Sequence, residues 1–308
     1  MTAKPIITVN VFPGGFNWPI YVGQDKGFFE RHGIAVELQG TPDSVTQMTD
    51  FSRGKFDIAM TAVDNIVAYV EGQGQAPIGP QPEFFGFMGV DTGFLSLVAV
   101  PGITSIEDLR GKTVSVDALT TGYAFVLYEI LRRNGLELDK GDYQLVSAGG
   151  MVQRWNGLRE GRHHATLLSA PYNLIARNAG FSDLVRATDV IGPYQGNVAA
   201  TRRSWAANNM GKIVSYVRAF RDSVTWLYEP LNRVEAIEIL CRHLPQMPPE
   251  IAAASYPELL HPAHGFFKTC ELDREGLKCA LDLRNRYAPS TKSLGAPDRY
   301  YDAQYSHR

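Results

Sequence analysis

The feature that most constrains this chain is a regular alternation of short β-branched apolar runs with stretches of helical periodicity. Short turns between such segments favour a parallel sheet that is covered by helices on both faces. The first cycle is expected to contain strands at 7–12, 35–40 and 56–61 and helices at 18–33, 43–53 and 64–73.

A second cycle of the same kind follows, and from about residue 202 the pattern becomes mostly helical. Its expected elements are strands at 84–90, 94–100, 112–117, 142–149 and 163–170 and helices at 104–111, 122–136, 152–161 and 171–180. We therefore predict an α/β protein of two units, each built on a mainly parallel sheet flanked by helices, with a helical C-terminal tail.

Composition and charge exclude several classes of protein. Hydrophobic residues make up 44% of the 308 residues and charged residues 20%, which is ordinary globular composition. The 30 basic and 32 acidic residues give a net charge of −2, which argues against a nucleic-acid surface or a polybasic membrane anchor. No apolar run approaches the roughly 18 residues that a transmembrane segment needs. We expect a soluble monomer with a small-molecule ligand and no nucleic-acid partner.

The amino terminus and the cysteines bear on the compartment. The first fifteen residues, MTAKPIITVNVFPGG, contain neither the apolar core nor the cleavage site of a secretory signal. We expect a periplasmic protein if a native signal has been removed and a cytoplasmic protein otherwise. Cys241, Cys270 and Cys279 form no C-x-x-C pair, so they are interpreted as three buried thiols.

The predicted ligand site lies in the turns that follow the strands. In open parallel sheets, ligands bind beyond the carboxyl ends of the strands, where helix N-termini point free N–H groups outward. These turns are rich in small hydroxyl residues and glycine, and several contain an aromatic residue. Such residues also serve as helix caps and turn formers. Six such turns on one side of two sheets favour a cleft. The predicted ligand-binding residues are Phe16, Asn17, Trp18, Thr41, Thr61, Asp64, Asn65, Thr120, Thr121, Gly122, Tyr123, Arg154, Tyr172 and Tyr194.

Several of these residues have an expected role. Trp18 starts the first helix and should form one wall of the cleft. Asp64 is expected to cap its helix or to accept a hydrogen bond from the solute. Arg154 suits a bound carboxylate or sulfonate, although a solvated helix arginine is an equally open interpretation. Tyr172 and Tyr194 are expected to close over an aromatic ring. The excess of aromatic over charged residues favours an aromatic or hydrophobic acid.

Catalytic and metal-binding patterns are weak. His163 and His164 are adjacent on a strand, so they face opposite sides and are interpreted as a solvated pair. His261 and His264 flank a proline without the i, i+4 spacing of a helical metal site, and they are interpreted as structural. Neither a dinucleotide-binding glycine pattern nor a P-loop nor a nucleophile elbow occurs. We predict no catalytic residue, no metal ligand and no cofactor.

Four segments, in this order, resemble the solute-binding proteins of ABC importers, in the branch that handles sulfonates, taurine, nitrate and thiamine-pyrimidine precursors. The segments are GQDKGFFERHGIAVEL at 23–38, GKFDIAMTAVDN at 54–65, SIEDLRGKTVSVDALTTGYAFVLYEILRRNGL at 105–136 and LREGRHHATLLSAPYNLIARNAGF at 158–181. The matches lie within roughly residues 6–200. His164 stands where the family pattern has an acidic residue.

The resemblance implies the type 2 fold of periplasmic binding proteins, in which a hinge closes two lobes over the ligand. Lobe one is expected at 1–90 plus 200–308 and lobe two at 91–199. An ABC permease is the implied partner if the protein is exported. The ligand is expected to be a small anionic organic molecule that is aromatic or hydrophobic.

The same fold also hosts enzymes, which remain the alternative. A desulfinase of this type needs a cysteine in the first turn, and a pyrimidine synthase needs a cysteine-rich segment; the sequence offers neither. A decarboxylase of an aromatic acid stays open, drawing on Asp64, Asp117 or Arg154. We favour binding over catalysis.

Overall fold

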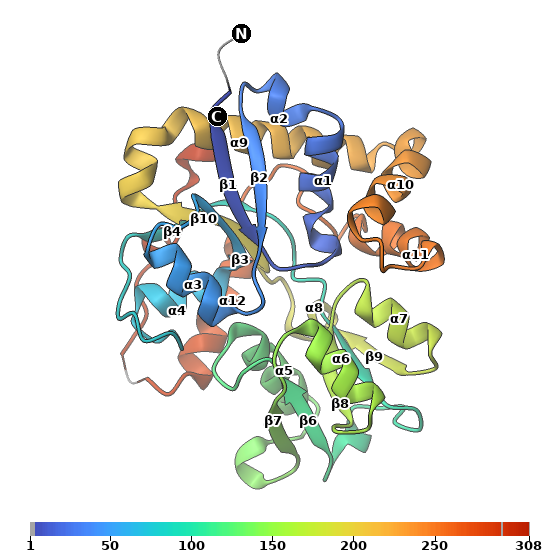
Figure 1. Ribbon diagram of the computed structural model, residues 1–308. Helices are drawn as coiled ribbons and strands as arrows, with labels where there is room; N and C mark the ends of the chain where they lie inside the picture. The colour runs from blue at the N-terminus through green and yellow to red at the C-terminus, as the bar shows by residue number, and fades with distance from the viewer. Residues whose placement is uncertain (1–3, 291, 308) are drawn as a thin grey trace.

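Two five-stranded sheets organise the computed structural model, which describes residues 4–290 and 292–307. Residues 1–3, where the segment interpreted as lacking a signal begins, lie outside the described residues. The strand order is β2-β1-β3-β10-β4 in the first sheet and β7-β6-β8-β5-β9 in the second. Figure 1 shows the first sheet in the upper half of the molecule and the second sheet in the lower half.

Each sheet is mainly parallel, as predicted, with one strand reversed. The first sheet comprises β1 (Ile6–Val11), β2 (Ala35–Gly40), β3 (Ile58–Ala62), β4 (Phe84–Gly89) and β10 (Asn197–Arg202). The second comprises β5 (Ser96–Ala99), β6 (Thr113–Val116), β7 (Gln144–Ser147), β8 (Ala165–Leu168) and β9 (Ser182–Arg186). Only β10 and β5 run antiparallel to their neighbours, and each is the first strand after the chain crosses from the other sheet. The sequence interpretation missed β9 and β10.

Helices cover both sheets. The first sheet carries α1 (Trp18–Asp25), α2 (Phe28–Arg31), α3 (Ser44–Ser52), α4 (Val63–Val70) and α9 (Arg203–Tyr228). The second carries α5 (Gly122–Arg133), α6 (Met151–Arg159), α7 (Tyr172–Asn178) and α8 (Ala187–Ile191). The tail adds α10 (Arg233–His243), α11 (Pro249–Leu259) and α12 (Arg274–Tyr287). None of the helices in the described part of the chain combines the length and apolar character that a membrane crossing requires.

Two predicted helices differ from the observed ones. The helix expected at 18–33 is interrupted between α1 and α2, because Gly27 adopts a left-handed φ of 69° that ends one helical segment before the next begins. The helix expected at 104–111 is a single 3-10 turn, Glu107–Leu109. The Asp108 carboxylate, inside this turn, accepts hydrogen bonds from the backbone N–H groups of Thr104 and Ser105.

The two crossovers between the sheets pack directly on each other. A Cβ atom added to Gly196 would lie 2.0 Å from the backbone nitrogen of Gly93, so Gly196 has no room for a side chain there. Asp91 is buried between the crossovers, and its Oδ1 accepts hydrogen bonds from the backbone N–H of Gly93 and from the N–H and side-chain amide of Asn197. This arrangement joins the two units at one compact hinge.

The cysteines are all free, and they differ in exposure. Cys270 is buried, as expected, and burial raises the pKa of its thiol to about 12. Cys241 and Cys279 are partly exposed, which contradicts the expectation of three buried thiols. Burial raises the pKa of the Cys279 thiol to about 11, which keeps that group protonated at neutral pH.

Candidate ligand-binding site between the two sheets

The strand-end turns of the two sheets face one another at close range. Three glycines show how closely the turns approach, because a Cβ atom added to each would lie near the opposite unit. An added Cβ on Gly15 would lie 3.4 Å from Ala170 O, and one on Gly150 would lie 3.7 Å from Pro42 O. An added Cβ on Gly122 would lie 2.4 Å from the Asp64 Cβ. In Figure 1 the arrowheads of β1 and β2 point toward the lower unit, as this meeting requires. The predicted cleft faces therefore come together, and here they are shut against each other.

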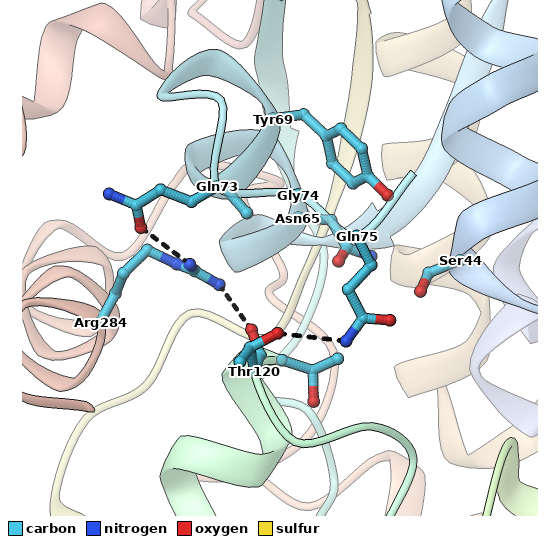
Figure 2. Close-up of a pocket in the computed structure, with 10 residues that line it drawn as sticks. Ser44, Asn65, Tyr69, Gln73, Gly74, Gln75, Thr120 and Arg284 are labelled. Atoms are coloured by element: carbon cyan, nitrogen blue, oxygen red, sulfur yellow. Dashed lines mark hydrogen bonds between the residues drawn. The ribbon is translucent and has the colours of Figure 1, made fainter. Parts of the chain in front are cut away.

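A small pocket lies at this interface, and three predicted residues line it (Figure 2). Its volume of about 10 Å³ holds no more than roughly one water molecule. The lining residues are Ser44, Asn65, Ala68, Tyr69, Gln73, Gly74, Gln75, Thr120, Thr121 and Arg284. A solute larger than water therefore enters only if the two units separate.

The hydroxyl residues around this pocket already have partners. The Asn65 amide donates to Thr61 Oγ1 at 2.9 Å, and the Gln75 amide donates to Thr120 Oγ1 at 3.2 Å across the interface. Thr121 caps α5 by accepting a hydrogen bond from Ala124 N. Thr41 likewise donates its hydroxyl to Asp43 O in its own turn. Thr121 is thus a helix cap, and Thr41 is a turn residue.

Asp64 differs from its predicted role. It does not cap α4. Its carboxylate is not free to accept a hydrogen bond from a solute, because it forms a buried bidentate ion pair with Arg284 of α12, with both N–O distances at 2.6 Å. Burial lowers the pKa of Arg284, and the Asp64 carboxylate more than offsets this, so the net pKa is raised. Local sequence patterns could not predict this pair, because its members are 220 residues apart.

Trp18 also differs from its predicted role. Its side chain is fully buried in the core around α1 and α9, and the indole N–H donates to Ala236 O at 3.0 Å. It forms an edge-to-face pair with Tyr256. Trp18 is therefore a core residue rather than a cleft wall. Phe16, two residues earlier, is only half-buried and lies in the 3-10 turn Gly15–Asn17 that follows β1.

The two tyrosines expected to close over a ring take different neighbours. Tyr194 is buried and its ring lies 6.4 Å from that of Tyr123, on α5. Burial raises the pKa of both phenols, so they stay neutral and able to donate hydrogen bonds. Tyr172 instead packs against the small apolar cluster around Trp155. The pair that the structure brings together is Tyr123 and Tyr194.

Arg154 is a buried cation without a carboxylate partner among residues 4–290 and 292–307. Its side chain is almost fully buried; Nη1 donates to Leu167 O and Nη2 contacts the sulfur of Met151, while Nε has no partner in the described structure. Burial lowers the pKa of Arg154, while Asp117 and Tyr123 act in the opposite direction. The solvated interpretation of Arg154 is wrong. A buried guanidinium of this kind is suited to an anion.

Other buried polar atoms at the strand ends lack hydrogen-bond partners within the described part of the chain. They are Asn17 Oδ1 after β1, both amide atoms of Asn173 after β8 and Tyr194 Oη before β10. Each such group costs about 1–3 kcal/mol when it is left unpaired. Asn173 was not among the predicted residues, although an asparagine two positions after Pro171, at the start of a buried helix, was a usable signal.

The histidine pair is not solvated as expected. His163 is buried and its Nε2 lies 3.0 Å from Arg154 O, and burial lowers the pKa of its imidazole. His164 faces the other way, where its Nδ1 accepts a hydrogen bond from Thr113 N. Across the described residues, no group of three or more His, Cys, Asp or Glu side chains is placed to hold a metal ion.

Comparisons with known proteins identify a family for this chain and solved structures with the same fold. The family model described as "NMT1/THI5 like" matches residues 17–231. A search of curated proteins finds no significant match. Among solved structures, the periplasmic nitrate-binding protein NrtA from Synechocystis PCC 6803 superposes with a TM-score of 0.80 at 14% identity, covering 99% of this chain and 88% of that one.

Two further structures show the same fold. The ligand-binding component of an ABC-type import system from Staphylococcus aureus, solved with zinc bound, gives a TM-score of 0.79 at 12% identity, covering 99% of this chain and 98% of that one. The periplasmic aliphatic sulphonate-binding protein SsuA from Escherichia coli gives 0.73 at 15% identity, covering 98% and 94%. The predicted periplasmic-binding-protein fold is thereby confirmed.

Proposed function

The chain belongs to the NMT1/THI5-like family, and we propose that it is a solute-binding protein that captures a small organic anion between its two lobes. The lobes correspond to 1–90 plus 200–308 and to 91–199. Solved structures of this fold are named as a periplasmic nitrate-binding protein, a periplasmic aliphatic sulphonate-binding protein and the ligand-binding component of an ABC-type import system. An ABC permease is the implied partner, and the periplasm is the implied compartment.

One observation carries the proposal. Arg154 is a buried guanidinium with a free Nε and no carboxylate within salt-bridge distance in the described structure. It lies on α6, and Gly150, directly before that helix, approaches Pro42 of the other lobe. A buried unpaired cation is unfavourable by itself, and an anionic ligand compensates it. The unpaired amide of Asn173 and the phenol of Tyr194 supply further donors and acceptors at the same strand ends.

The finer ligand class follows from the aromatic residues. Tyr123 and Tyr194 form a ring pair beside the lobe interface, and half-buried Phe16 lies in the 3-10 turn that follows β1. Ring pairs of this kind contribute about 0.5–1.5 kcal/mol beyond burial. We therefore propose an aromatic or hydrophobic acid as the ligand in preference to nitrate or taurine.

A ligand screen with two arginine variants tests the proposal. Thermal-shift measurements with aromatic carboxylates, sulfonates, nitrate and neutral pyrimidines should give the largest stabilisation with an aromatic acid, because a ligand that binds only the native state raises the unfolding temperature. Arg154→Met should weaken binding of that acid by at least about 30-fold, consistent with the loss of a buried charge-assisted contact. Arg159→Met, on the exposed side of the same helix, should leave the affinity unchanged.

Two outcomes contradict this proposal. A neutral pyrimidine that binds wild type and Arg154→Met equally well would contradict the proposal that the ligand is an anion. Conversion of the best ligand into a product, detected by chromatography, would favour the enzyme alternative. Asp64, one of the residues on which that alternative draws, is already paired with Arg284.

A further inference from the structure

Helix α12 of the tail packs on the hinge at its N-terminal end. A Cβ atom added to Gly276 would lie 2.4 Å from the backbone nitrogen of Gln195, which belongs to the second crossover. The Gln195 side chain accepts a hydrogen bond from Asp273 N, directly before the helix, and donates one to Asn197 O. The start of α12 is therefore fixed to the hinge itself.

Farther along α12, one arginine contacts both lobes. Arg284 Nε and Nη2 donate to the two carboxylate oxygens of Asp64 on α4, and Nη1 donates to Gln73 Oε1 at 3.0 Å. The same Nη2 donates to Thr120 O, at 3.2 Å, in the turn before α5 of the second lobe. Figure 2 shows Arg284 between Gln73 and Thr120.

The C-terminal end of α12 is held to the second lobe. Tyr287 Oη donates to Glu129 Oε2 on α5 at 2.7 Å, and the Arg286 guanidinium lies 3.5 Å from the same carboxylate. The helix thus contacts the hinge, the first lobe and the second lobe in turn. The sequence-based division, which places the whole tail in lobe one, does not capture this.

The contact between Asp64 and Gly122 explains why the Asp64 carboxylate needs the positive charge of Arg284. The backbone of Gly122, at the start of α5, lies directly against the Asp64 side chain, so close that an added Cβ would be 2.6 Å from the Asp64 Cγ. The second lobe therefore covers the carboxylate when the lobes meet. A covered carboxylate without a counter-ion carries a large desolvation penalty, whereas one paired with a guanidinium does not.

We propose that Arg284 is a positioning residue that permits the lobes to close, because it neutralises Asp64 beneath Gly122 and ties the first lobe to Thr120 O of the second. Without this charge, closure would bury a lone carboxylate, and the open arrangement, which hydrates Asp64, becomes the favoured state. The inference deepens the proposed function and rests on it for its purpose, since capture requires closure. Arg284 itself need not touch the solute.

Small-angle X-ray scattering of the full chain without ligand tests this. The wild-type profile should fit the closed structure, while Arg284→Met and Asp64→Asn, which each leave one charge unpaired, should show a larger radius of gyration. The double variant Asp64→Asn/Arg284→Met buries no lone charge and should return to the wild-type profile. The matched control is Arg242→Met, which breaks a bidentate pair with Asp25 inside the first lobe and should scatter as wild type.

Three results would overturn the proposal: a wild-type profile that fits only separated lobes, a folded Arg284→Met that superimposes on wild type, or a double variant that stays expanded. Circular dichroism establishes that each variant is folded. If Arg284→Met does not fold, Asp64→Asn and the double variant are judged by the same criteria. No ligand enters these measurements, so an unsuccessful ligand screen would count against the proposed function and leave this result standing.

Discussion

At the scale of single residues, the protein keeps a cation and several amide and phenol groups buried without partners at the ends of its strands. Arg154 Nε, Asn173 and Tyr194 Oη are such groups in the described structure. Arrangements of this kind reduce stability and are retained where they serve binding. The unpaired groups are therefore a better indicator of the site than the hydroxyl residues, which already bond within their own turns.

This trade-off gives a prediction for the ligand-free protein. Arg154→Met removes a buried charge that has no carboxylate partner, so the variant should unfold at the same temperature as wild type or at a higher one. Differential scanning calorimetry without ligand measures this. A clear fall in the unfolding temperature would mean that the bond from Arg154 to Leu167 O is structural, and that the cation is needed for the fold rather than for a ligand.

A second prediction concerns Trp18. Because its indole is fully buried and hydrogen-bonded to Ala236 O, Trp18→Ala should reduce the free energy of unfolding by about 3–5 kcal/mol. Trp205→Ala, at a partly exposed position on α9, should cost clearly less. Urea denaturation measures both. Equal, small losses in the two variants would contradict the placement of Trp18 in the core.

The residue-level site was predictable only in part. Turn positions follow from the strand pattern, and the structure brings Asn65 and Thr120 together at the pocket between the sheets. Their role in ligand binding stays a prediction. Long-range pairing does not follow from the strand pattern: the partners of Asp64 and Trp18 lie on tail helices more than 200 residues away. Whether an aromatic residue at a strand end faces the cleft or the core depends on those helices.

At the scale of elements, the two crossovers carry the connection between the lobes. Gly93 and Gly196 touch backbone to backbone, which lets Asp91 reach Asn197. The strands that follow the crossovers, β5 and β10, run against their neighbours because the chain enters each sheet from the side of the other lobe. The alternation of strands and helices predicted the parallel strands, but β10 forms its sheet pairs with strands far earlier in the chain, and local pattern cannot reveal that.

A glycine substitution tests the crossover contact. Gly196→Ala should reduce the free energy of unfolding by on the order of 3 kcal/mol, because its Cβ would meet the backbone of Gly93. Gly211→Ala is the matched control: it lies in helix α9 with open space around it, so alanine should stabilise by about 0.5–1 kcal/mol. Chemical denaturation distinguishes the two. A neutral Gly196→Ala would show that the crossovers are not in backbone contact in solution.

Glu129 on helix α5 should make the free energy of unfolding depend on pH. Burial tends to raise the pKa of Glu129, but hydrogen bonds from Arg132, Tyr287 and Arg133 outweigh it and lower that pKa from its ordinary value of 4.5 to about 2. Because the folded-state pKa is depressed, the contribution to stability is complete above about pH 4.5 and is lost as the pH falls toward about 2. We expect on the order of 2 kcal/mol, after allowance for the partly exposed arginines.

The measurement is the free energy of unfolding between pH 7 and pH 2.5. Glu129→Gln should flatten the acid limb of this curve. Glu238→Gln, at an exposed position on α10, should leave the limb as it is in wild type. Identical acid limbs in wild type and Glu129→Gln would contradict the assigned role of the Glu129 cluster.

At the scale of the whole molecule, two lobes meet with their strand ends together, and the pocket between them has room for about one water molecule. In the proposed function, a solute binds as the lobes separate and close, and it contacts both. This two-sided contact distinguishes capture between lobes from binding at a surface groove, such as the groove of about 330 Å³ between α5 and α12.

Hydrogen–deuterium exchange with the best ligand from the screen shows whether the solute is held between the lobes. We expect slower exchange in both lobes at once: after β1 in the first lobe, and at the starts of α5, α6 and α7 in the second. Protection confined to one lobe, or to the α5–α12 groove around Lys278 and Asp282, would contradict capture between the lobes.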